Sequence, residues 1–155
     1  MCSGPLTRAV LLCLLCGALA AGCATGPERL PGLAAGRQIA GYAISLLGSP
    51  YRYGGADRAG FDCSGLVRYV HHELGIETPR TAAEQFRAAR PVAIGELAPG
   101  DLLFFRIDGT GISHVAIYVG AGRFVHAPRS GRPVESRPLE DAYYRPRLVA
   151  AGRLF

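Results

Sequence analysis

Cys63 is the residue of this chain whose surroundings are best suited to nucleophilic chemistry. It follows a turn-rich segment, residues 50–57, and precedes apolar residues at helical spacing over residues 64–74. Asp62 is a good N-cap for that helix and Gly75 a good terminator. Cys63 then lies in the first helical turn, where unpaired backbone N–H groups and the helix dipole stabilise a thiolate. This placement predicts a nucleophile.

A cysteine nucleophile needs a base, and the chain has four histidines. Two of them, His71 and His72, lie further along the same predicted helix as Cys63. The rise per residue places them roughly 12–13 Å from the start of the helix, so neither imidazole can reach the thiol. We predict that both are surface or helix-end residues.

The other two histidines come from predicted strands. His114 begins a strand at residues 114–119, and His126 lies in a strand at residues 123–127. If these strands pair through the turn at residues 120–122, His126 lies one diagonal step from His114 and the two rings can touch. A thiolate, an imidazole and a polar group that orients the imidazole form a nucleophile–base–orienter system. When a thiolate attacks a carbonyl, an oxyanion forms, and backbone N–H groups at the start of the helix can hold it.

Other roles are open for these residues. A solitary cysteine such as Cys63 can also serve simply as a small buried core residue. A strand histidine can likewise be a polar core residue whose hydrogen bonds are satisfied. Zinc binding by Cys63, His114 and His126 would use a sufficient number of ligands, but their separations match no recognised zinc spacing. We therefore expect neither a metal nor another cofactor.

The remaining pattern indicates which elements position these residues. Helical patterns come first, at residues 37–47 and, after the cysteine helix, at residues 81–89, where Thr81 and Glu84 form a capping box. Strand patterns follow at residues 102–105, 114–119, 123–127, 134–137 and 147–154. This order predicts an α+β fold, with amino-terminal helices packed on an antiparallel sheet of about five strands.

Length and composition favour one domain with a modest basic charge. The chain has 155 residues, which is enough for a single hydrophobic core. Its net charge is +5, and all 17 basic residues are arginines that are scattered along the sequence. Because they form no aromatic-rich basic stretch, the sequence argues against nucleic-acid binding. We expect a monomer with a solvated, mildly basic surface.

The amino terminus has the features of a targeting segment. Arg8 provides a positive charge, residues 9–15 form an apolar run too short to span a bilayer, and small residues precede Cys23. The pattern resembles a bacterial lipoprotein signal over residues 1–22, with Cys23 as the lipidated membrane anchor. An ordinary secretory signal cut near Ala21 is the alternative.

Residues 23–36 are rich in Gly and Pro, which predicts a flexible tether between the lipid and a domain at residues 37–155. Ala24 stands where an Asp would indicate retention in the inner membrane, so we expect delivery to the periplasmic face of the outer membrane. Removal of the signal leaves Cys63 as the one free thiol of the mature chain. Since a solitary thiol is a liability in an oxidising compartment, chemistry is the simplest reason to keep it.

Five segments of the chain carry recognisable motifs. They are residues 48–55 (GSPYRYGG), 62–67 (DCSGLV), 79–81 (PRT), 99–105 (PGDLLFF) and 114–120 (HVAIYVG). In this order they resemble the NlpC-type cell-wall peptidases, which are papain-like cysteine peptidases of bacteria. The resemblance covers about residues 36–150 and implies a papain-like fold.

The resemblance also implies roles for individual residues. Cys63 would be the nucleophile, and His114 the general base that later protonates the leaving amine. His126 would orient His114. The hydroxyl of Tyr51 would help to bind the oxyanion, with Tyr53 as the other candidate for that role. Substrate contacts are implied for the two residues that flank the nucleophile, Asp62 and Ser64.

The reaction of the family is hydrolysis of amide bonds in peptidoglycan stem peptides or their cross-links. The resemblance therefore implies a cell-wall cysteine endopeptidase with a Cys-His-His mechanism and peptidoglycan stem peptides as its partner. Two alternatives remain. One is a non-catalytic, envelope-anchored module that binds peptidoglycan through the same groove, and the other is an acyl transferase that uses Cys63.

Overall fold

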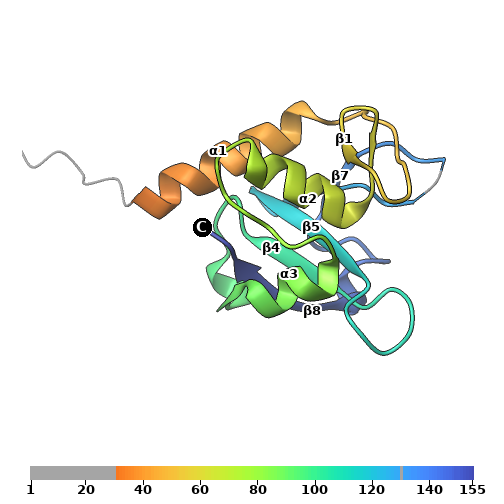
Figure 1. Ribbon diagram of the computed structural model, residues 1–155. Helices are drawn as coiled ribbons and strands as arrows, with labels where there is room; N and C mark the ends of the chain where they lie inside the picture. The colour runs from red at the N-terminus through yellow and green to blue at the C-terminus, as the bar shows by residue number, and fades with distance from the viewer. Residues whose placement is uncertain (1–30, 130) are drawn as a thin grey trace, which may run out of the picture.

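The computed structural model describes residues 31–129 and 131–155 (Figure 1). The predicted signal peptide, the predicted lipidation site Cys23 and the first part of the predicted tether lie outside these residues. Within the described ranges, no helix combines the length and apolar character needed to cross a membrane.

The described residues form helices in the first half and strands mainly in the second. The helices are α1 (Pro31–Ser45), α2 (Cys63–His72) and α3 (Ala82–Ala88), with short 3-10 turns at η1 (Ile94–Glu96) and η2 (Arg145–Arg147). The strands are β1 (Ala56–Asp57), β2 (Gly60–Phe61), β3 (Arg90–Val92), β4 (Leu102–Phe105), β5 (His114–Gly120), β6 (Arg123–His126), β7 (Glu135–Pro138) and β8 (Leu148–Arg153).

Helix α1 begins earlier than the sequence predicts, because residues 31–36, expected to end the flexible tether, form its first turns. Gly36 packs so tightly that an added Cβ would collide with the carbonyl oxygen of Pro99 and crowd the ring of Phe155. This glycine therefore allows close packing and does not provide flexibility.

The predicted α+β fold is confirmed. Six strands form one antiparallel sheet in the order β3-β8-β4-β5-β6-β7, and β1 and β2 form a separate small hairpin. The sheet has one strand more than the approximate count from sequence, because β3 was not predicted. Pro91 lies in the middle of this three-residue strand and hides its strand pattern, but proline is tolerated there because β3 is at the edge of the sheet.

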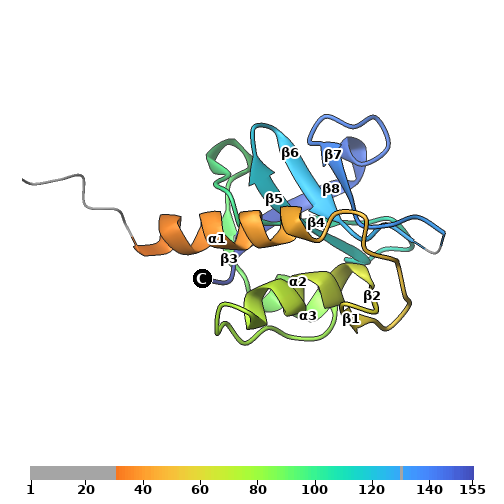
Figure 2. The ribbon, with the colours of Figure 1, turned by 90° about the horizontal axis from the view of Figure 1, so that it is seen from above.

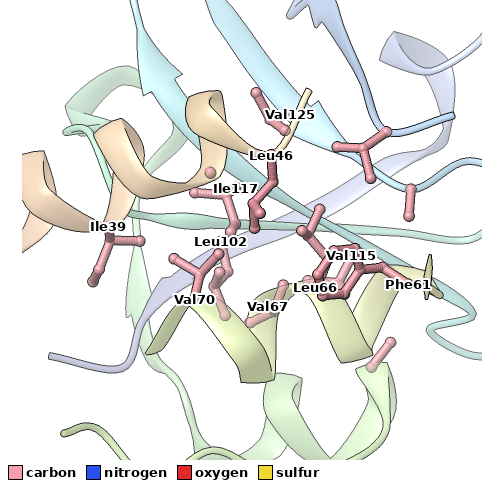
Figure 3. Packing of buried hydrophobic residues seen from close by; sticks show 14 of the residues in the cluster. Ile39, Leu46, Phe61, Leu66, Val67, Val70, Leu102, Val115, Ile117 and Val125 are labelled. Atoms are coloured by element: carbon pink, nitrogen blue, oxygen red, sulfur yellow. The ribbon is translucent and has the colours of Figure 1, made fainter. Parts of the chain in front are cut away.

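One face of the sheet is covered by helices. Figure 2 shows α1 and α2 running beside each other across the sheet. Their apolar side chains meet those of the central strands. Figure 3 shows this layer for Leu46, in the turn directly after α1, for Val67 of α2, and for Leu102 and Ile117 of β4 and β5. All four are at most 2% exposed. Burial of each such side chain contributes roughly 1.5–3 kcal/mol, so this layer is the main core.

The opposite face of the sheet carries a second, more aromatic cluster. Strand β4 is buried on both faces, and its alternate residues Leu103 and Phe105 point into this cluster. Phe124 of β6 and Tyr144, from the loop between β7 and η2, complete the cluster with other residues of that face. The aromatic face matters for function because the two predicted strand histidines lie on it.

The predicted hairpin of β5 and β6 is confirmed. Ile117 pairs with Val125 and Tyr118 with Phe124, and a bulge near the turn shifts the register so that Gly120 pairs with Arg123. The pairing leaves His114 and His126 near the open end of the hairpin, away from the turn, as the sequence predicts.

Candidate functional site

Cys63 is the first residue of α2, and Asp62 caps this helix as predicted. The Asp62 Oδ1 accepts a hydrogen bond from the N–H of Gly65 at 2.7 Å. The backbone of Gly65 packs directly on the carbonyl of Gly55, where any side chain would collide. The turn-rich segment before the helix therefore holds its first turn, and with it Cys63, in one position.

The thiol of Cys63 lies against the end of β5. The backbone N–H groups of Val115, Ser64 and Cys63 itself lie close enough to the sulfur to lower the pKa of the thiol. Since Val115 is the residue after His114, the sulfur meets the sheet beside the predicted base. Both Cys63 and His114 line one cleft of about 1200 Å³.

His114 and His126 touch, as the hairpin register predicts. The Nε2 of His114 lies 2.9 Å from the Nδ1 of His126, and the two rings are nearly perpendicular. The His126 ring is completely buried, and His114 is only 6% exposed. Because Nε2 of His114 is occupied by His126, the Nδ1 atom is the ring nitrogen left to serve the thiol.

Tyr144 holds this pair of histidines from the side and was missed by the sequence reasoning. Its ring centroid lies 4.8 Å from that of His126 and 6.1 Å from that of His114. Phe105 and Phe124 surround the same rings. Burial raises the pKa of Tyr144 to about 12, so its hydroxyl remains protonated at neutral pH. No local pattern reveals that a loop residue returns to this face.

The protonation state of the resting pair differs from the sequence-based expectation. Burial raises the pKa of the Cys63 thiol, and this outweighs the backbone N–H groups that lower it. Burial also lowers the pKa of His114 to about 3, with a smaller contribution from His126. Both directions favour the uncharged forms at neutral pH, a thiol on Cys63 and a neutral imidazole on His114. A neutral imidazole can accept the thiol proton, so His114 is suited to general-base chemistry.

Tyr51 and Tyr53 both line the cleft but differ in position. Tyr51 is partly buried, and burial, followed by the charge of an ionised Cys63, raises the pKa of its hydroxyl. A protonated hydroxyl near the sulfur is a donor for an oxyanion. Tyr53 is 90% exposed and lies on the outer part of the cleft wall. The geometry therefore favours Tyr51 for the oxyanion role.

Asp62 and Ser64 line the cleft, but both are engaged by Arg80, to which the sequence reasoning gave no role. The guanidinium of Arg80 binds the two carboxylate oxygens of Asp62 at 3.0 and 2.5 Å and the Oγ of Ser64 at 3.0 Å. The Asp62 carboxylate also accepts hydrogen bonds from the backbone N–H groups of Gly54 and Gly65. The sequence offered one signal for this role of Arg80, which is its position as a charged residue directly before the Thr81 capping box.

The two remaining histidines are both in the last turn of α2, as the predicted helix-end position requires, but His71 is not on the surface. It lies near the end of α2, but its side chain is completely buried and its Nδ1 is 2.8 Å from the Val67 carbonyl. A distance estimate along the helix axis does not reveal this burial. His72 is exposed as predicted. Among residues 31–129 and 131–155, no group of three His, Cys, Asp or Glu side chains could hold a metal ion.

Sequence comparisons identify the family of the chain. The chain matches the NlpC/P60 family over residues 48–153. It is 45% identical over 116 residues to the murein DD-endopeptidase MepH of Escherichia coli, covering 72% of this chain and 43% of that protein. It is 40% identical over 112 residues to the gamma-D-glutamyl-L-lysine dipeptidyl-peptidase of Bacillus subtilis, covering 71% and 38%. The chain thus spans less than half the length of these two relatives.

Solved structures agree with the fold. An NlpC/P60 family protein from Bacillus cereus has a TM-score of 0.73 at 35% identity, covering 77% of this chain and 40% of that one. The NlpC/p60 domain of the peptidoglycan hydrolase SagA has a TM-score of 0.66 at 34% identity, covering 76% and 97%. The chain therefore belongs to the NlpC/P60 family, and its helices and antiparallel sheet form the papain-like α+β fold of that family.

Proposed function

We propose that this protein is a cysteine peptidase that hydrolyses amide bonds in peptidoglycan stem peptides or their cross-links. One observation carries the proposal. A helix-start thiol lies against the strand residue next to His114, and the far nitrogen of His114 is bound to His126 at 2.9 Å. The proposed nucleophile and base line one cleft, and the proposed orienter is buried behind the base, which supports an acyl-transfer mechanism.

The proposed reaction begins with a substrate carbonyl beside Cys63. As the sulfur attacks the carbonyl carbon, the thiol proton moves to Nδ1 of His114. The oxyanion is held by backbone N–H groups at the start of α2 and by the Tyr51 hydroxyl. When the intermediate collapses, the C–N bond breaks and His114 returns the proton to the leaving amine.

A thioester between Cys63 and the acyl part of the substrate remains. His114 takes a proton from water, whose oxygen attacks the thioester carbonyl. The C–S bond then breaks, and the thiolate recovers the proton from His114. The cycle therefore consumes one water and yields one acid and one amine. The same base serves both halves because each half needs a proton acceptor and then a donor at the same place.

The substrate class is supported by the relatives. Their names describe a murein DD-endopeptidase, a gamma-D-glutamyl-L-lysine dipeptidyl-peptidase and a bifunctional muramidase/DL-endopeptidase. Peptide bonds of the cell wall are common to these descriptions. A cleft with both charged and aromatic walls suits such short peptides, which carry free carboxylates and amines.

We also propose that a lipid on Cys23 anchors the protein to the periplasmic face of the outer membrane. Peptidoglycan is within reach of a tethered domain there. The expected state is a monomer. The intact mass of the chain isolated from membranes tests the anchor, since lipidation at Cys23 adds acyl chains that a Cys23→Ser variant lacks.

Digestion of purified sacculi tests the activity. The protein is incubated with sacculi, and the released muropeptides are identified by mass spectrometry. We expect defined peptide fragments from the wild type and none from Cys63→Ala. Sacculi that are bound equally by both proteins but cut by neither would instead indicate a binding module. Products that carry an added amine in place of water would indicate an acyl transferase.

A further inference from the structure

The outer nitrogen of His126 has an unusual environment. The ring is completely buried, and its Nε2 makes no hydrogen bond in the part of the chain that the structure describes. The Oε1 of Glu135 lies 3.4 Å from this atom. A shift of roughly 0.5 Å would give an ordinary N–H···O distance. Glu135 of β7 is the direct cross-strand partner of His126 on β6, so the register of the sheet places the carboxylate there.

Proton counting shows what this carboxylate can do. A neutral imidazole has one N–H and one acceptor nitrogen. For Nδ1 of His114 to accept the thiol proton, Nε2 of His114 must carry the hydrogen and donate it to Nδ1 of His126. His126 must then carry its own hydrogen on Nε2, which faces Glu135. The productive arrangement therefore ends in an N–H that points at a carboxylate.

The opposite arrangement is unfavourable for the same reason. If His126 carried its hydrogen on Nδ1, that hydrogen would be donated to His114, whose own hydrogen would then lie on Nδ1 and block the transfer from Cys63. The lone pair on Nε2 of His126 would also face the negative charge of Glu135. Burial lowers the pKa of His126 to about 3, so the ring is neutral and has only these two tautomers.

Glu135 is itself held in place. Arg132 binds its Oε2 at 2.6 Å, and Arg137 binds its Oε1 at 3.1 Å. Arg137 also lies 3.7 Å from Asp141, so two arginines and a second carboxylate surround the group. The cleft is lined by Arg132, Arg137 and Asp141, whereas Glu135 is behind them and does not line it. An effect of Glu135 on the reaction must then pass through His126 or through the two arginines, and the tautomers of His126 distinguish these two routes.

We infer that Glu135 is a positioning residue that fixes the tautomers of His126 and His114, so that Nδ1 of His114 is ready to accept the thiol proton. The inference rests on the proposed Cys-His-His mechanism. It adds a fourth member to the chain of groups, supplied by an edge strand, and gives the neutral orienter the carboxylate support that it otherwise lacks.

The first test reads the tautomers directly and needs no substrate. Two-bond ¹⁵N–¹H correlation spectra of the ¹⁵N-labelled full chain distinguish an imidazole with its hydrogen on Nε2 from one with its hydrogen on Nδ1. We expect the Nε2–H form for both His114 and His126. A wild-type spectrum with the hydrogen of His126 on Nδ1 overturns the inference, even if no peptidase activity is found.

The second test compares two variants of matched size. Glu135→Gln keeps an oxygen acceptor and Glu135→Met does not, and both remove the same charge from Arg132 and Arg137. We expect Glu135→Met to lower kcat by about tenfold or more with KM nearly unchanged, and Glu135→Gln to retain most of the activity. Only Glu135→Met should populate the Nδ1–H form of His126.

Glu140→Met is the control, because Glu140 pairs with Arg145 at an exposed position and should leave kcat and the tautomers unchanged. Equal kcat values for the two Glu135 variants overturn the inference. If both fail to fold, as judged by circular dichroism, the wild-type spectrum decides. A wild type without activity but with the expected tautomers would count against the proposed function and not against the role of Glu135.

Discussion

The two walls of the cleft are built in different ways. The wall that carries Cys63 is polar and is held by hydrogen bonds and by the ion pair of Asp62 with Arg80. The wall that carries His114 and His126 is aromatic and closely packed, with Tyr144 across both rings. The first wall fixes the sulfur by directed contacts, whereas the second keeps the imidazoles neutral by excluding water. The proposed nucleophile and the proposed base are thus held in place in different ways, and the fold joins the two walls at the end of β5.

The largest effects should come from the histidines themselves. His114→Ala removes the proton acceptor and should lower kcat/KM by about 10⁴-fold. His126→Ala leaves the base in place but without its partner, so we expect a loss of only about 10²-fold. Steady-state assays on a purified stem peptide measure both, with circular dichroism to confirm the fold. Equal losses for the two variants would mean that His126 is more than an orienter.

The aromatic wall can be tested at Tyr144. Tyr144→Ala leaves a cavity beside both histidines and should lower the free energy of unfolding by about 3 kcal/mol. Tyr144→Phe keeps the ring and should cost less than about 1 kcal/mol, because packing and not the hydroxyl holds the histidines. Urea titrations measure both. A large loss for the Phe variant would show that the hydroxyl has a role which packing does not explain.

The polar wall can be tested at Arg80. Arg80→Ala leaves the Asp62 carboxylate without its partner at a position only 14% exposed, and should cost about 2 kcal/mol of unfolding free energy. Arg52→Ala is a matched control, since its ion pair with Asp57 is about half exposed on both sides and should contribute less than about 1 kcal/mol. If the two variants lose the same stability, Arg80 does not clamp the start of α2.

The pH dependence of Cys63 alkylation tests the environment of the thiol without any mutation. Because burial raises the pKa of the Cys63 thiol, the thiolate fraction at pH 6 should lie below that of a model thiol. Iodoacetamide should therefore label Cys63 slowly at pH 6, and the rate should still rise above pH 9. Rapid labelling at pH 6 with a plateau would show a thiolate–imidazolium pair at rest.

Local signals predicted much of this arrangement. The Asp62 cap, the Thr81–Glu84 capping box and the pairing of the β5–β6 hairpin are all confirmed, because each depends on residues close together in the sequence. Alternation along the strands also placed His114 and His126 within contact.

Features that depend on distant residues were not predictable. Gly36 looks like part of a linker until the carbonyl of Pro99 packs against it, and no local pattern shows that the His71 side chain is completely buried. Tyr144 and Glu135 reach the histidines only through the loop after β7 and the edge pairing of β7. The directions of the Cys63 and His114 pKa shifts follow from burial. The sequence-based argument considered only the start of the helix and its dipole, and these do not show how deeply a side chain is buried.

The central claim is that Cys63 forms the bond to the substrate while His114 moves the proton. Acid-quenched mixtures of the protein with a peptidoglycan stem peptide, analysed by intact-protein mass spectrometry, test it most directly. We expect an adduct with the mass of the acyl fragment on Cys63, removable by hydroxylamine, absent in Cys63→Ala and strongly slowed in His114→Ala. Cleavage of the peptide by Cys63→Ala, without any adduct, would contradict the account.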